Sequence, residues 1–163
     1  MRKIQALWIL LLLTSNNIFA GAFESYQIER RAIITYIQKG NTTAAYACVY
    51  TAANYAVAAG RRDHAAWIYN NVAHGIITKF YEHSKYTELM GLAAAVRPSM
   101  RDAYLQHVRQ KLRPYVKSLS TARELLLRAQ FEDEKSSRSD QERTNKIKRN
   151  LRTVTNILTA ISN

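Results

Sequence analysis

The segment that most constrains the fold runs from Thr42 to Gly60 and contains no charged residue. Its sequence, TTAAYACVYTAANYAVAAG, consists mainly of alanine and tyrosine, and alanine is the strongest helix former. A helix without charge has no face that water solvates well, so other helices should cover much of its surface. We therefore predict a central helix over Thr43–Ala59.

A second helix is predicted directly after the first. Gly60 is the expected left-handed cap of the first helix, and Asp63 is the expected cap of a helix that runs to about Glu82. Apolar residues recur in it at three- and four-residue intervals, as on the inner side of a packed helix. The two helices form a predicted hairpin, residues 42–86, around which the domain is built.

The same periodicity predicts an all-α fold for the rest of the chain. Glycine and proline number only 5 and 2, and the alternation typical of strands is absent. Further helices are predicted at Glu24–Lys39, at Thr87–Val96, from Pro98 onward and after Asn145. From residue 105 to residue 129 apolar residues step alternately by three and four, and we expect Pro114 to kink this helix rather than end it.

The predicted architecture is a compact multi-helix bundle, in which two long C-terminal helices close over the alanine- and tyrosine-rich hairpin. Residues 131–145, FEDEKSSRSDQERTN, connect these two helices. Because this segment is charged and rich in serine, we predict that it is exposed, either as a continuation of the helix or as a mobile connection.

The N-terminus has the pattern of a secretory signal peptide. Arg2 and Lys3 precede the apolar run ALWILLLL, and small residues end at Ala22. The run is shorter than the ~20 residues that a membrane-spanning helix needs. The sequence thus predicts a signal peptide, residues 1–22, cleaved after Ala22 or after Ala20. The mature chain, residues 23–163, is predicted to be a single helical domain, exported to a periplasm or secreted.

No known catalytic signature occurs in the sequence. It lacks HExxH, CxxC, a glycine-rich phosphate loop and a nucleophile elbow, and no two histidines have the spacing of a metal pair on one helix. The single cysteine, Cys48, lies in an apolar run and is predicted to be a packing residue rather than a reactive thiol. We therefore expect a protein that is not an enzyme and that uses no metal or cofactor.

The positive charge is the most informative surface feature. The chain carries a net charge of +12, which favours acidic partners. Arg109, Arg113 and Lys117 step by four and should form one stripe on a helix, and Arg61 and Arg62 lie in the hairpin turn. These five residues are the predicted partner-binding positions.

The hairpin resembles a single tetratricopeptide repeat. The residues that carry the resemblance are Ala53, Gly60, Ala65 and Tyr69. Ala56 and Val49 depart from the aromatic residues of that family, and no second copy follows at a period of ~34 residues. The resemblance implies a helical hairpin of the kind that presents peptide- or protein-binding surfaces.

The sequence favours an exported protein-binding module, such as an immunity or inhibitor protein, a chaperone or an accessory of an envelope machine. The alternative is a secreted effector or toxin acting on an anionic membrane or a host target. The membrane contacts would then be Lys146, Lys148, Arg149 and Arg152. A cell-wall glycan hydrolase, with Glu82 or Glu88 as its acid, is a third reading, and nucleic acid is not an expected partner of an exported protein.

Overall fold

The computed structural model describes residues 2–162, and the side chains of residues 19–162. All regular elements in this range are helical, which confirms the all-α prediction. The elements are α1 (Arg2–Gln38), α2 (Thr42–Ala58), α3 (Arg62–Ser84), α4 (Tyr86–Ala95), α5 (Pro98–Leu112), the short 3-10 turn η1 (Arg113–Tyr115), α6 (Val116–Glu134) and α7 (Gln141–Ser162).

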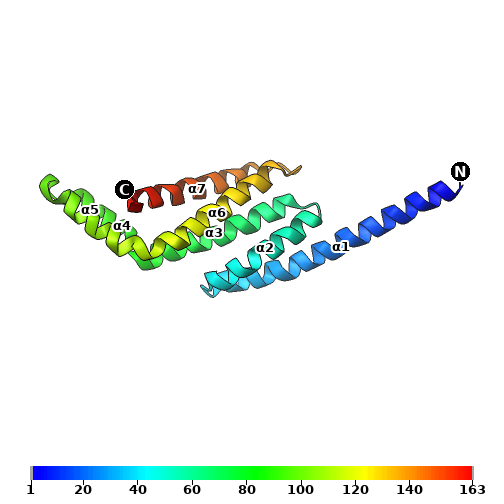
Figure 1. The fold of residues 1–163 in the computed structure, drawn as a ribbon, viewed down its shortest axis with the longest axis horizontal. Coiled ribbons are helices and arrows are strands. Elements are labelled where there is room, and N and C mark those ends of the chain that lie inside the picture. Colours follow the sequence, from blue (N-terminus) through cyan, green and yellow to red (C-terminus); the bar gives the residue numbers. More distant parts are fainter. Residues whose placement is uncertain (1, 163) are drawn as a thin grey trace.

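The longer helices lie side by side, each antiparallel to the next, in the order α1, α2, α3, α6 and α7 (Figure 1). Helices α1 and α3 also touch, as do α3 and α7. Tyr50 of α2 donates a hydrogen bond to Glu124 of α6 at 3.1 Å, so these two helices are neighbours on one side of α3. The row is therefore folded, with α1, α3 and α7 along one side and α2 and α6 along the other, while α4 and α5 project from one end.

Helix α2 lies between α1 and α3 and contributes small residues to the core. Ala45, Ala52 and Ala56 are completely buried, and their small side chains allow both neighbouring helices to approach closely. The opposite face of α2 is exposed at Thr51 and Asn54. Helix α2 is therefore not covered on all sides, and its open face carries uncharged polar side chains that water can solvate.

Gly60 ends α2 as predicted, and Gly40 ends α1 in the same way. Gly40 and Gly60 both have φ of +69°, a left-handed conformation that glycine adopts without steric cost. The side chain of Asn41 then accepts a hydrogen bond from the amide of Ala44 at 3.1 Å and caps α2. The predicted cap at Asp63 is wrong, because α3 begins at Arg62 and Asp63 lies in its first turn.

The helix predicted to kink at Pro114 is instead two helices. Helix α5 ends at Leu112, the chain makes one 3-10 turn, and α6 leaves in a different direction (Figure 1). Proline lacks an amide hydrogen and its ring clashes with the preceding turn, which interrupts the α-helical bonding. The apolar seam is nevertheless buried on both sides of the break, at Val108, Leu112, Leu119 and Leu126.

The segment 131–145 is largely helical and in part less exposed than its composition predicts. Only residues 135–140 lie between α6 and α7. The side chains of Arg143 and Asp133 are just 3% and 7% exposed and form an ion pair with each other. Thr144 donates to the same carboxylate at 2.5 Å, and Arg143 Nη2 donates to the carbonyl of Arg138 at 2.6 Å. The prediction of an exposed segment is thus wrong at Arg143 and Asp133, because each charge is neutralised by the other.

The predicted signal peptide, residues 1–22, falls mostly on residues whose side chains lie outside the described part of the chain, and it stays a prediction. Within the described residues, no helix combines the length and the apolar character needed to cross a membrane.

Candidate protein-binding surfaces

Three of the predicted partner-binding residues surround one depression. Arg109 comes from α5, Arg113 from η1 and Lys117 from α6, and the backbone stays helical at Leu112, Arg113 and Val116, which keeps the three on one side of the bend. The depression has a volume of about 640 Å³, and Val116 and Ile161 add an apolar wall. We call it the cationic depression, lined by Arg109, Gln110, Arg113, Val116, Lys117, Ile161 and Ser162.

The charges of the cationic depression have no internal counter-charge in the described residues. The arginine and lysine ion pairs in this part of the chain all involve residues outside the depression. The Nε atom of Arg109 is buried and has no hydrogen-bond partner in the same range. A buried donor without a partner is unfavourable. An anionic group that enters the depression would be attracted by the charges of Arg109, Arg113 and Lys117, which line it.

Arg61 and Arg62 lie elsewhere and are already engaged. Arg61 donates to the carboxylate of Asp63 at 2.9 and 3.0 Å, and Arg62 pairs with Glu132 of α6 at 2.5 Å. Lys117 and Glu132 stand at opposite ends of α6, separated by about 22 Å at 1.5 Å per residue. The structure therefore does not bring these two arginines to the cationic depression, and their role in partner binding stays a prediction.

The cations of the membrane alternative all lie on α7. Lys146 pairs with Glu142 at 2.6 Å and its ammonium lies over the ring of Trp67 at 5.3 Å. Lys148, Arg149 and Arg152 are exposed. The apolar residues of the same helix, Ile147, Val154, Ile157 and Ile161, are buried in the bundle. Helix α7 thus has exposed charge but no free apolar stripe of the kind that inserts into a membrane interface.

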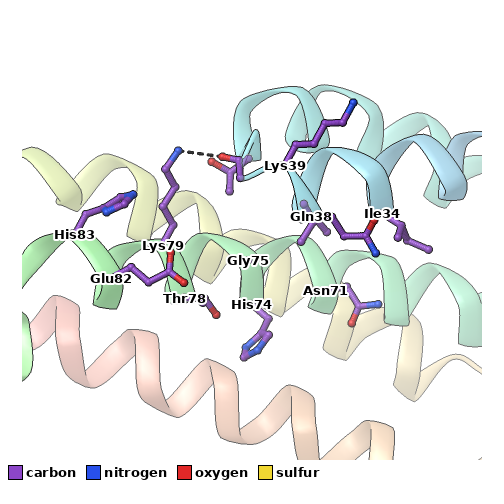
Figure 2. A pocket seen from close by; sticks show the side chains of 13 residues that line it. Ile34, Gln38, Lys39, Asn71, His74, Gly75, Thr78, Lys79, Glu82 and His83 are labelled. Carbon is purple, nitrogen blue, oxygen red and sulfur yellow. Dashed lines mark hydrogen bonds between the residues drawn. The ribbon is translucent and has the colours of Figure 1, made fainter.

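A groove between α1 and α3 was not predicted from the sequence. Two adjoining hollows of about 660 and 390 Å³ share Ile34, Ile37 and Asn71, and together they form what we call the α1–α3 groove. Figure 2 shows Ile34 and Gln38 of α1 and Asn71, His74 and Thr78 of α3 along it. The available signal was a stripe of exposed polar residues on α3 at three- and four-residue spacing, namely Asn71, His74, Thr78 and Glu82.

The groove is positively charged towards both ends. Arg30 and His64 line one end, Lys39 and Lys79 line the other, and Glu82 is the acidic residue of the lining. Burial, together with the charge of Arg61, lowers the pKa of His64, so its imidazole is held in the neutral form. The groove therefore attracts anionic groups at its ends and offers neutral polar groups at its centre.

The glycan-hydrolase reading depends on Glu82 or Glu88. Glu82 lines the groove, whereas Glu88 lies exposed on α4 and lines neither hollow. Among the described residues, no three His, Cys, Asp or Glu side chains are grouped closely enough to hold a metal ion.

Comparisons of the chain with protein-family models, with curated proteins and with solved structures found no match. The resemblance of residues 42–86 to a tetratricopeptide hairpin therefore stays a prediction. The structure shows two antiparallel helices in contact over this segment, a geometry that many helical folds share.

Proposed function

We propose that this chain is an exported helical protein-binding module that holds an acidic segment of a partner protein in the cationic depression. An immunity or inhibitor protein, a chaperone and an envelope-machine accessory are the kinds of protein that fit this role. The observation that carries the proposal is the grouping of Arg109, Arg113 and Lys117 around one depression, without a carboxylate partner among the described residues. The signal-peptide pattern supports export.

The chemistry of the depression suits a protein segment with carboxylate side chains. Each guanidinium presents a planar fork of donors that matches a carboxylate, and such charge-assisted bonds are about twice as strong as neutral ones. Val116 is partly exposed beside the charges, and the small exposed part of Ile161 adjoins it. An acidic segment with an aliphatic residue next to its carboxylates would use both features.

A pair of charge-reversal variants tests the proposal. Arg109→Glu with Arg113→Glu alters the depression, and Arg149→Glu with Arg152→Glu makes the same change of net charge on exposed positions of α7. The probe is a fluorescein-labelled hexaglutamate peptide, followed by fluorescence anisotropy. We expect the first variant to weaken binding by about tenfold or more, through loss of close charge pairs. The second should change it by less than about twofold at physiological salt, where exposed charges are screened.

Equal losses in the two variants would show that binding follows net charge alone and that the depression is not the site. Circular dichroism of both variants verifies that each remains folded.

The membrane alternative has its own measurement. In this alternative the exposed cations of α7 contact the anionic membrane. Vesicles rich in phosphatidylserine should then carry the chain upward in a flotation gradient. Substitution of Lys148 and Arg149 by serine should then abolish flotation, since each basic residue near an anionic surface contributes about 1 kcal/mol. Flotation of the unaltered chain, lost in this variant, would favour the effector reading over the protein-binding one.

A further inference from the structure

We propose that the α1–α3 groove is a second binding site, separate from the cationic depression, and that it holds an extended acidic peptide of a partner protein. The proposal rests on the length of the groove, on its glycine floor and on the distribution of its charges. It does not depend on the cationic depression.

The groove is continuous because α1 and α3 run side by side in the same direction. The rings of Tyr26 and His64 lie 5.2 Å apart at one end, and Lys79 donates to the carbonyl of Gly40 at 3.1 Å at the other (Figure 2). Along α3 the lining runs from His64 to His83, which corresponds to about 28 Å of helix. An extended peptide of about eight residues has this length.

The floor of the groove contains a glycine that the fold does not require. Gly75 lies inside α3, where glycine is the least favourable residue after proline. A methyl group at this position would meet the side chain of Ile37 at 3.5 Å, which is an ordinary contact. Packing therefore tolerates alanine here. What glycine provides is an open floor, on which the backbone of a bound chain can approach the helix closely.

Polar side chains stand beside this floor. Asn71 and Gln38 line the groove from opposite helices, and each amide offers both donors and an acceptor. An extended peptide presents alternating amide and carbonyl groups that such side chains can pair. Ile34, also on the lining, is 36% exposed and gives an apolar contact for one side chain of the peptide.

The charges decide the chemistry of the peptide. Arg30 at one end and Lys39 and Lys79 at the other outnumber the single lining carboxylate, Glu82. A peptide with acidic residues at both ends and an apolar residue at its centre complements this pattern. A basic peptide would meet like charges at both ends.

The test uses two glycine variants of the full chain. Gly75→Ala adds a methyl group to the groove floor, and Gly91→Ala makes the same change on α4, where a Cβ atom would have no neighbour within 4 Å. The probe is a fluorescein-labelled peptide, Asp-Glu-Thr-Leu-Thr-Thr-Glu-Asp, followed by anisotropy. We expect Gly75→Ala to weaken binding by about fivefold or more while its melting temperature stays equal or rises, because alanine favours the helix. Gly91→Ala should leave the affinity unchanged.

Further arms separate the two binding sites and the role of charge. Arg30→Ser with Lys39→Ser should weaken binding of the same octapeptide. An analogue with Asn and Gln in place of Asp and Glu should bind less tightly than the acidic octapeptide. The Arg109→Glu, Arg113→Glu variant should still bind the octapeptide. Equal affinity in the two glycine variants, or loss of octapeptide binding in the Arg109→Glu, Arg113→Glu variant, would overturn the proposal. Absence of octapeptide binding to the unaltered chain would overturn it as well, and none of these three results depends on hexaglutamate binding.

Discussion

Asn150 of α7 donates a hydrogen bond from Nδ2 to Oδ1 of Asn70 in α3 at 3.0 Å, and the two residues are separated by 80 positions in the chain. Both side chains are buried. A buried amide is satisfied only where its partner is in reach, so this pair holds α7 in one register along α3.

Breaking the asparagine pair on one side should destabilise the fold. Asn150→Leu leaves the Asn70 amide buried without its partner, which costs about 1–3 kcal/mol of unfolding free energy. Adding Asn70→Leu removes the second polar group, so the double variant should recover most of the loss. Urea denaturation of the two single variants and the double variant measures this coupling. Losses that simply add would show that the hydrogen bond does not link the two helices.

The buried ion pair between Arg143 and Asp133 should contribute more to the unfolding free energy than the asparagine pair does. Removing one partner leaves an uncompensated buried charge, and Arg143→Met should therefore lower the unfolding free energy by about 3–5 kcal/mol. Arg149→Met, at an exposed position of the same helix, is the matched control and should change it by less than about 0.5 kcal/mol. Similar melting temperatures for the two variants would contradict the role assigned to this pair.

The stability of the α1–α3 contact should depend on pH through His64. Burial and the charge of Arg61 lower the pKa of His64, so the unfolded chain binds this proton more strongly than the folded one. The unfolding free energy that depends on a neutral His64 is thus fully present above about pH 6.5, the ordinary pKa of histidine. It is lost as the pH falls towards the lowered pKa of His64 in the folded chain.

Denaturation at a series of pH values between about 7.5 and 5 measures this effect. The expected change is less than about 1 kcal/mol, since the ring is partly solvated and its interactions are screened. His64→Gln should flatten the profile. Burial acts to raise the pKa of Asp63, but the hydrogen bond from Arg61 and nearby positive charge outweigh burial, and the pKa is lowered. Asp63 therefore changes the pH dependence of stability only below this pH range. An unchanged slope in His64→Gln would exclude His64 as the group responsible.

The glycine at the end of α2 should respond to substitution in the opposite sense from a glycine inside a helix. Gly60 has φ of +69°, and a side chain in this conformation costs about 1–2 kcal/mol. Gly60→Ala should therefore lower the melting temperature. Gly91→Ala in α4 should raise it, by an amount equivalent to about 0.5–1 kcal/mol. Thermal melts of the two variants measure the difference, and shifts of the same sign would contradict the left-handed cap.

The helices of the hairpin were predictable to within one or two residues at most ends. Alanine-rich composition defined α2, and apolar spacing between Gly60 and the polar residues near Glu82 defined α3. Arg109, Arg113 and Lys117 line one depression, as their four-residue spacing predicts, because the backbone keeps helical angles at Leu112, Arg113 and Val116. These are local properties of the chain.

Other features were not predictable from local patterns. Arg143 and Asp133 belong to a charged, serine-rich segment, and nothing in that segment indicates that these two charges meet and become buried. Pro114 permitted either a kink or a break, and the outcome is a break with α5 and α6 at an angle. The α1–α3 groove does not follow from the sequence, because the apolar spacing of α3 identifies its buried face but not the helix that borders its polar face.

The sequence by itself determined which segments are helical, where glycine ends them and which side of each helix is apolar, because hydrogen bonds and side-chain spacing within a helix involve residues only a few positions apart. Only the tertiary structure decided which polar faces stay open and which become buried. Ile37 stands beside Gly75, and Asn70 beside Asn150, since α2 and α6 hold the helices on either side of them at fixed separations. Such neighbours are far apart in the chain, so their proximity follows from the packing of whole helices.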